Sequence, residues 1–289
     1  MRLAIIVAAS PGAGAMPSVG ERDAILMRGR LELEDLGFEV QVADPSYDLA
    51  EQIGGLLEDY RGKTDAVLLY ASALLAVADE DECFLCLDPD DPDIGDSLKD
   101  LAFELSAHGA PTTLIILEGR FASERDVDDH DMAQYVISSI ADSVDAEQTG
   151  IEVTAGVRPL DAQDERIPSR MTAGLLETID SSAAPLSMDR AFATMRGLTD
   201  FGPWAHGLLH VAGAEKFILR YDDEQRSRMD RGEESGKPAA KPAAADRFPD
   251  RRPAPPSERI EVASIGAHER IAVLPTRDPT TLPKVMLSP

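Results

Sequence analysis

Several residue types are scarce in this chain of 289 residues, and each scarcity excludes a class of protein. Only two cysteines occur, Cys83 and Cys86, so no disulfide framework holds the fold. Aromatic residues make up 5% of the chain, which indicates a core built mainly of Ala, Leu, Ile and Val. No apolar stretch approaches the roughly 20 residues of a membrane-spanning helix. Residues 1–9 carry one Arg and a short apolar run, which fits a first core strand better than a signal peptide.

Basic residues are also few, since 28 Lys and Arg stand against 53 Asp and Glu, for a formal net charge of −25. Such a charge repels phosphate backbones and anionic membrane surfaces. We therefore expect neither nucleic acid nor a membrane as partner, and we expect a cytoplasmic location. A surface adapted to a saline or crowded habitat would have the same composition.

Strand and helix patterns alternate up to about residue 180. The expected strands are 3–8, 38–43, 66–70, 82–87, 114–117 and 151–155, and the expected helices are 18–36, 49–60, 97–107, 132–144 and 170–179. This order predicts an α/β fold, a doubly wound, mostly parallel sheet of about six strands. In the first helix, apolar residues recur near the helical period and predict the buried face: Ile25, Leu26, Leu33 and Leu36.

The composition divides the chain into four parts. Residues 1–185 are expected to form the α/β domain, and residues 186–221 are apolar enough to pack against it. Residues 222–257 are dense in Pro, Ala and charged side chains, which predicts a disordered linker. Residues 258–289 regain short apolar runs, which predict a tail with short strands that adds an edge strand or docks on a partner.

Two segments place a buried strand directly before small and polar residues. They are DAVLLYASALL at 65–75 and TLIILEGRFAS at 113–123. An open α/β sheet has its functional loops at such strand ends. Together with the opening strand RLAIIVAAS, a first helix that carries Asp23, and the last helix SRMTAGLLETI, these segments resemble the caspase-like cysteine peptidases of the bacterial branch. The resemblance covers roughly residues 1–180 and implies a caspase-like fold.

The resemblance also implies where the catalytic dyad would lie, and both positions are substituted. The family has Tyr-x-Ser-Gly-His-Gly in the first segment and Asp-x-Cys-x-Ser-Gly in the second. Tyr70 and Ser72 match, but the histidine slot holds Leu74 and the cysteine slot holds Arg120. Leucine cannot transfer a proton, and a guanidinium cannot form a thioester. We therefore expect no catalytic residue, and a pseudoenzyme that acts as a protein-binding or regulatory module.

Four residues are candidates for a peptide-binding cleft: Tyr70, Ser72, Glu118 and Arg120. Arg120 is expected either to pair with a carboxylate of an acidic peptide or to plug the cleft through an internal ion pair with Glu118. In family members that cut after basic residues, an acidic side chain two places before the nucleophile recognises the substrate, and Glu118 holds that place. The expected partner is an active caspase-like protease or a second copy of this chain. No cofactor and no metal is expected.

Two alternatives stay open. In the first, the chain is an active caspase-family cysteine endopeptidase with a relocated dyad, in which Cys83 or Cys86 is the nucleophile and His108 or His130 is the base. In the second, the chain is a structural adaptor that uses its linker and tail.

Other polar motifs favour structural roles. His206 and His210 are four residues apart and would share a helical face as metal ligands, but no carboxylate motif accompanies them, so packing is favoured. The run DPDDPDIGD at 88–96 lacks the spacing and the distal Glu of a calcium-binding EF-hand loop, which favours a solvated loop.

Overall fold

The computed structural model describes residues 1–8, 19–44, 48–77, 82–88, 91–122, 127–160, 169–199, 201, 207–230, 270–273 and 284–287. Their strands are β1 (Arg2–Ala8), β2 (Phe38–Ala43), β3 (Ala66–Val77), β4 (Cys83–Asp88), β5 (Asp91–Ser97), β6 (Thr112–Phe121), β7 (Glu152–Pro159), β8 (Leu186–Ser187), β9 (Leu208–Val211), β10 (Ile218–Arg220), β11 (Arg270–Val273) and β12 (Lys284–Leu287). Their helices are α1 (Val19–Leu31), α2 (Leu49–Asp59), α3 (Leu98–His108), α4 (Asp129–Val144), α5 (Ala146–Thr149), α6 (Arg170–Ser181), α7 (Met188–Leu198) and α8 (Asp223–Asp230).

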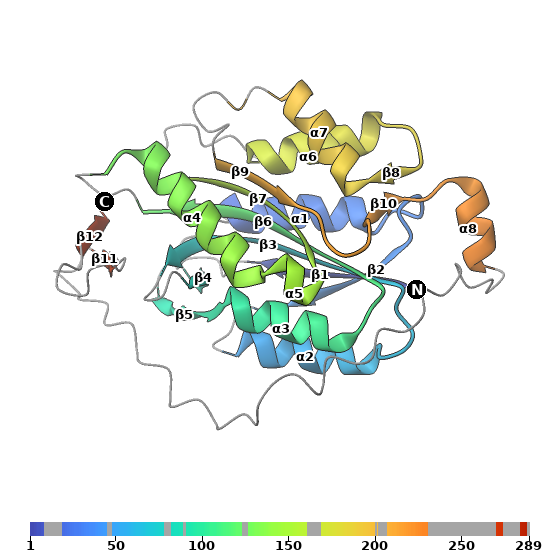
Figure 1. The fold of residues 1–289 in the computed structure, drawn as a ribbon, viewed down its shortest axis with the longest axis horizontal. Helices are drawn as coiled ribbons and strands as arrows, with labels where there is room; N and C mark the ends of the chain where they lie inside the picture. The colour runs from blue at the N-terminus through green and yellow to red at the C-terminus, as the bar shows by residue number, and fades with distance from the viewer. Residues whose placement is uncertain are drawn as a thin grey trace.

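The central sheet runs in the order β2-β1-β3-β6-β7-β9, with the β4–β5 hairpin attached to the end of β3. The first five strands of this order are parallel, whereas β9, β4 and β5 pair antiparallel with their neighbours. The carboxyl ends of the parallel strands therefore meet at one edge of the sheet. The prediction of a doubly wound, mostly parallel α/β sheet is confirmed (Figure 1).

Each face of the sheet has its own layer of helices (Figure 1). Helices α2, α3 and α4 pack on one face in a first core, and α1, α6 and α7 pack on the other in a second core. Alternate residues of a strand divide between the two cores, because successive side chains of a strand point to opposite faces. In β1, Leu3 and Ile5 face the first core, while Ala4 and Ile6 face the second. A strand buried on both faces needs a continuous apolar run.

The buried face of α1 differs from the predicted one. Ile25 and Leu26 are 56% and 41% exposed, and Leu33 lies beyond the end of the helix, 51% exposed. The buried face instead combines small, polar and apolar residues at helical spacing: Gly20, Asp23, Ala24, Met27 and Leu31. The prediction was right for Leu36, which is 2% exposed and lies in the second core. It was wrong for Ile25, Leu26 and Leu33, because it followed apolar side chains alone and this face buries a carboxylate and a glycine.

Both segments of the resemblance remain strand beyond their predicted ends. β3 continues to Val77 rather than ending at Tyr70, and β6 continues to Phe121. In β3 the apolar residues after Ser72 stand where a loop would need glycines, so the chain stays extended and pairs with β4.

The acidic run at 88–96 is not wholly a loop, because β5 occupies its second part and pairs with β4. The carboxylate of Asp96 accepts a hydrogen bond of 3.1 Å from the backbone N–H of Ala50, in the first turn of α2. Burial raises the pKa of Asp96 to about 6, against the opposing effect of these backbone hydrogen bonds. This carboxylate therefore caps a helix.

The residues after α6 add a helix to the second layer and a strand to the edge of the sheet. Helix α7 places Met188, Ala191 and Met195 in the second core, and β9 pairs with β7. Helix α8 begins inside the segment predicted as linker, and residues 231–257 lie outside the described residues. In the predicted tail, β11 and β12 form an antiparallel pair.

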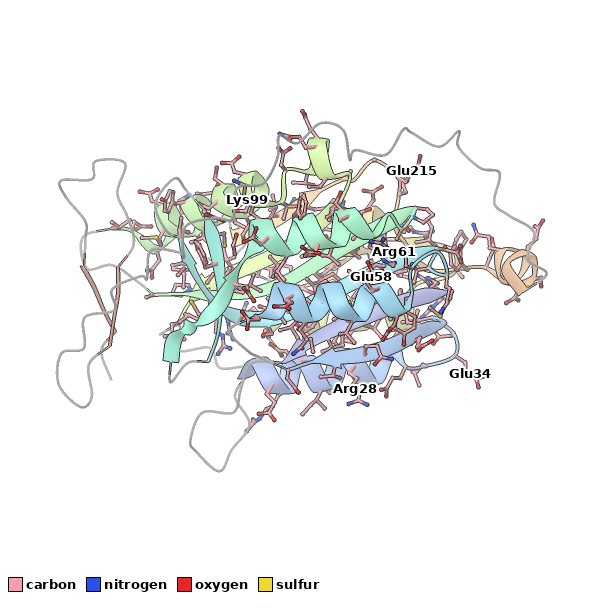
Figure 2. The ribbon with its side chains drawn as sticks, turned by 90° about the horizontal axis from the view of Figure 1, so that it is seen from below. Arg28, Glu34, Glu58, Arg61, Lys99 and Glu215 are labelled. Atoms are coloured by element: carbon pink, nitrogen blue, oxygen red, sulfur yellow. The ribbon has the colours of Figure 1, made fainter. Side chains whose placement is uncertain are left out.

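The outer face of the helices is charged. Figure 2 shows Glu58 and Arg61 close together near the end of α2, where Glu58 Oε1 lies 2.9 Å from Arg61 Nη2. Both side chains are mostly exposed, so solvent screens the pair and its contribution to stability is small. None of the helices in the described ranges combines the length and the apolar character that crossing a bilayer requires.

Candidate functional site

The carboxyl edge of the sheet brings together the two positions that the resemblance assigns to the catalytic dyad. In the register of β3 and β6, Leu74 lies beside Arg120, and Arg120 in turn lies beside Arg158 of β7. One step back along the same face, Ser72 lies beside Glu118. These positions continue the strand faces that pack on α1 and α6. The ends of β3 and β6 thus face a common space. The side chains there are Leu74 and Arg120, not a histidine and a cysteine.

Asp23 closes this space from α1. It is fully buried and accepts a hydrogen bond of 2.8 Å from the backbone N–H of Ser169, as well as hydrogen bonds from the hydroxyl groups of Ser169 and Ser72. Burial raises the pKa of Asp23, while Ser169, Arg120 and Arg158 oppose that rise. Since Ser169 directly precedes α6, this carboxyl group ties α1 to the start of α6.

Glu118 is buried where β6 meets α6, with 4% of its surface exposed. Its Oε2 accepts hydrogen bonds from the backbone N–H of Thr172, at 3.1 Å, and from the Thr172 hydroxyl, at 3.2 Å. The same hydroxyl lies 2.8 Å from the phenol oxygen of Tyr70. Burial and the neighbouring Asp23 raise the pKa of Glu118 to about 8. The carboxyl group is therefore largely protonated at neutral pH.

Arg120 stands in the slot that the resemblance assigns to the cysteine. Burial and the like charge of Arg158 lower its pKa, and the charges of Asp23 and Glu118 oppose that effect. Within the described ranges no acidic side chain lies within ion-pair distance of Arg120, so the expected bridge to Glu118 is not formed. The carboxyl group of Glu118 is instead bound by Thr172. We call Asp23, Glu118, Arg120 and Arg158 the carboxyl-edge cluster.

Gly20 of α1 makes room for the Arg120 side chain. A Cβ atom at this position would lie 2.7 Å from the Ser72 carbonyl oxygen and 3.0 Å from Arg120 Nη2. Only a residue without a side chain lets the helix approach the sheet this closely. Helix α1 and the guanidinium therefore fill much of the space at the carboxyl edge.

The cavity that remains beside this cluster is small. It has a volume of about 20 Å³, and its lining includes Glu118, Gly156, Arg158 and Met171. One water molecule needs roughly 10–15 Å³ of such volume. The cavity therefore admits about one water and no amino-acid side chain.

Three of the four predicted cleft residues are covered by the protein itself. Tyr70, Ser72 and Glu118 are 0%, 1% and 4% exposed, whereas Arg120 is partly exposed. A peptide that reaches this edge would contact Arg120 before it contacts the other three. The role of these residues in peptide binding stays a prediction.

Three members of the site were missed in the sequence: Arg158, Ser169 and Thr172. Arg158 follows the apolar run of β7 as Arg120 follows that of β6, so the rule that parallel strand ends meet at one edge could have found it. No sequence signal marks Ser169 and Thr172, because their partners are more than 50 residues away.

Both cysteines lie in β4, which pairs with the end of β3, so that Cys86 lies opposite Leu74 and Cys83 lies opposite Val77. Cys83 is fully buried in the first core, and burial raises its pKa strongly. Cys86 is 5% exposed and belongs to neither core, as expected for two strand positions three apart. A nucleophilic cysteine needs a thiolate and access to substrate, and the surroundings of Cys83 supply neither.

The histidines proposed as bases are separated from Cys83. His108 ends α3 and lies 2.5 Å from the Thr64 hydroxyl, near the amino end of β3, whereas Cys83 pairs with Val77 at its carboxyl end. His130 is exposed in the first turn of α4, and Cys83 donates a hydrogen bond to Ser143 at the far end of that helix. The helix between residues 130 and 143 spans about 20 Å.

The two histidines considered as metal ligands do not share a helix. His210 lies in β9, and His206 lies outside the described residues, as does His268. The shared helical face, which the sequence disfavoured, does not form, because the chain is an edge strand at His210.

No model of a known protein family matches the chain, and no curated protein matches it either. Solved structures do resemble it. The initiator caspase Dronc of Drosophila is 9% identical, with a TM-score of 0.51, over 76% of this chain and 85% of that chain. Caspase-1 of Spodoptera frugiperda is 11% identical, with a TM-score of 0.47, over 77% of this chain and 90% of that chain. The similarity to Dronc shows a caspase-like fold.

Proposed function

We propose that this caspase-like chain is a catalytically inactive pseudo-protease that acts as a protein-binding or regulatory module. One observation carries the proposal: Leu74 and Arg120 lie side by side at the carboxyl edge of the sheet, in the two slots where the resemblance expects a histidine and a cysteine. Peptide hydrolysis by this class of enzyme needs a thiolate, a base and donors for the oxyanion. Loss of one member of such a dyad typically removes several orders of magnitude of rate.

The packing of the carboxyl-edge cluster supports the same proposal. The cleft space holds a guanidinium, two buried carboxyl groups and a cavity of about 20 Å³. None of the four side chains of the cluster offers a thiolate or an imidazole for attack on a peptide bond. The contacts within the cluster stabilise the fold, and none of them serves a catalytic step.

Sheet edges supply the surface through which we propose that the module binds. Within the described residues β9 pairs only with β7 and β2 pairs only with β1, so each has one edge without a described neighbour. Such an edge accepts a strand from another chain. The proposed partner is an active caspase-like protease or a second copy of this chain. The net charge of −25 disfavours nucleic acid and membrane surfaces.

A peptide-cleavage assay tests the catalytic half of the proposal. The full chain is incubated with a library of peptides that present acidic, basic and apolar residues, with an active caspase as the positive control. We expect no cleavage above the background of the double variant Cys83→Ala, Cys86→Ala. Cleavage that the wild type shows and this variant lacks would establish a relocated cysteine nucleophile and overturn the proposal.

Sedimentation velocity tests the binding half. We expect the full chain to form a dimer by itself at micromolar concentration, or a complex when an active caspase-like protease is added. The variant Val211→Lys places a charge on the edge strand β9 and is expected to weaken either complex. Binding that is lost only when the chain is truncated after residue 221 would favour the structural adaptor instead.

A further inference from the structure

Glu152, Asp189 and His210 converge at the other end of β7, on the face of the sheet that also carries Arg158. Glu152 is the first residue of β7, His210 lies in β9, and Asp189 lies in the first turn of α7. One nitrogen or oxygen atom from each lies within 4.8 Å of the other two. Figure 1 shows α7 above the edge of the sheet that β9 forms. We call these three residues the amino-edge cluster.

The Nε2 atom of His210 faces both carboxyl groups. It lies 2.9 Å from Asp189 Oδ1 and 3.7 Å from Glu152 Oε1. The side chain of Asp189 is 34% exposed and that of His210 is 13% exposed, so the cluster opens to solvent on one side. An ion can therefore reach Asp189 and His210 from solvent, whereas Glu152 is 2% exposed.

Glu152 is the member whose hydrogen bonding is incomplete. Its side chain is 2% exposed, and Oε2 accepts a hydrogen bond of 3.0 Å from the backbone N–H of Phe217. Its other oxygen, Oε1, is buried and has no hydrogen-bond partner. A buried carboxylate oxygen without a partner is costly. This oxygen faces His210 Nε2, so an ion bound between the three side chains would supply the partner that Oε1 lacks.

The surrounding residues orient the cluster for an ion. Thr154 Oγ1 lies 2.9 Å from His210 Nδ1, and the ring of Phe192 stacks on the imidazole with 5.0 Å between the ring centres. Lys216 Nζ lies 3.2 Å from Asp189 Oδ2, which leaves Oδ1 for the cluster. Metal-binding histidines typically use one ring nitrogen for the ion and donate the other N–H to an oxygen. Here Nδ1 has such an oxygen, and Nε2 points to the cluster.

We propose that the amino-edge cluster binds one divalent transition-metal ion, with Zn²⁺ as the best match. Zinc bonds of about 2.0–2.2 Å at tetrahedral angles place ligand atoms about 3.4 Å apart, and the cluster has separations of 2.9 Å and 3.7 Å. Two carboxylates balance the charge of the ion, and the imidazole favours a transition metal over Ca²⁺ or Mg²⁺. Three protein ligands leave a position for water on the exposed side. The bound ion ties β9 and α7 to the start of β7.

Isothermal titration calorimetry of the full chain tests this site. The protein is freed of metal with a chelator and titrated with ZnCl₂ in millimolar Mg²⁺, which occupies weak sites among the many surface carboxylates. We expect one equivalent of Zn²⁺ to bind with a micromolar or lower dissociation constant, and the thermal midpoint to rise on binding. The variants Glu152→Gln and Asp189→Asn are expected to weaken binding at least 10-fold each.

The matched control is Glu215→Gln, which removes an exposed carboxylate from the same loop region, beside Lys216 (Figure 2). It is expected to bind Zn²⁺ as the wild type does. Circular dichroism of each metal-free variant checks that it is folded, and Glu152→Gln keeps an oxygen for the Phe217 N–H. The proposal is overturned if no saturable binding tighter than millimolar is found, or if a folded Glu152→Gln variant binds as tightly as the control.

Discussion

Two groups of buried charge share one face of β7 and differ in how that charge is balanced. In the carboxyl-edge cluster Glu118 is largely protonated at neutral pH, so Asp23 stands against the guanidinium groups of Arg120 and Arg158. The amino-edge cluster has two acids, Glu152 and Asp189, against one imidazole and the exposed Lys216. The six residues from Glu152 to Arg158 place the two groups about 20 Å apart along the strand.

The difference indicates which end of the sheet is closed and which is open to a ligand. At the carboxyl edge, backbone and hydroxyl donors of Ser169 and Thr172 bind the acids, and Arg120 takes up the remaining space. At the amino edge, one oxygen of Glu152 has no hydrogen-bond partner. Both acids at the carboxyl edge thus have hydrogen-bond donors, whereas Oε1 of Glu152 at the opposite end has none.

The largest expected effect comes from removing Asp23. In Asp23→Ala the N–H of Ser169 loses its acceptor, and Arg120 and Arg158 lose a compensating charge. We expect the free energy of unfolding to fall by about 3–5 kcal/mol, because the buried N–H and hydroxyl of Ser169 both lose their acceptor and each such loss costs about 1–3 kcal/mol. Urea denaturation followed by circular dichroism measures it. Asp23→Asn keeps an oxygen for Ser169 and should lose less; equal, small losses in both variants would show that the cluster is not needed for stability.

The raised pKa of Glu118 leads us to expect that the stability of the protein depends on pH. The pKa of Glu118 in the folded protein, about 8, lies above the ordinary value of 4.5. The folded state therefore keeps a proton that the unfolded chain releases, so this contribution is complete below about pH 4.5 and is lost as the pH rises through about 8.

Relative to wild type, we expect Glu118→Gln, which stays neutral, to gain roughly 4 kcal/mol in stability as the pH rises from about 5 to about 9. Denaturation midpoints across this range provide the measurement. Glu147→Gln, at an exposed position, is the control and should run parallel to wild type. A stability difference between Glu118→Gln and wild type that does not change with pH would contradict the raised pKa.

The smallest effect concerns the close approach of α1 to the carboxyl edge. In Gly20→Ala the new Cβ would lie 2.7 Å from the Ser72 carbonyl oxygen, so we expect a loss of about 1–2 kcal/mol. In Gly29→Ala, on the same helix, nothing lies within 4 Å of the new Cβ, and helix propensity predicts a gain of about 0.5–1 kcal/mol. Thermal unfolding of both variants compares them directly. A gain in stability in both variants would mean that α1 is free to move away from Arg120.

Patterns of apolar residues were sufficient to predict the class of fold, but not where every strand and helix ends. The alternation of strands and helices predicted the parallel sheet, because strands buried on both faces carry long apolar runs. The strand ends at Tyr70 and residue 117 were placed too early, since a strand that pairs with a new neighbour continues past the point where apolar residues thin out. The exposed Ile25 and Leu26 show the opposite error, in which apolar residues were assigned to a core they do not face.

The candidate site was predictable only where neighbouring strands supply it. Leu74 and Arg120 come from adjacent strand ends, so the family pattern was enough to pair them. Arg158 was missed although it holds the equivalent place on the next strand. Asp189 and His210 come from a short helix start and an edge strand, and neither element has a periodic pattern long enough to place it.

The sequence by itself determined the class of fold, the strongly acidic charge and the absence of a histidine and a cysteine from the two slots, because each follows from residue types and their order. The tertiary structure alone decided which charges are balanced and which are not. Hydrogen bonds join Asp23 to Ser169, Glu118 to Thr172 and Glu152 to Phe217 across 146, 54 and 65 residues. Such partners meet only after helices pack on the sheet, and burial then sets the strength of every interaction between them.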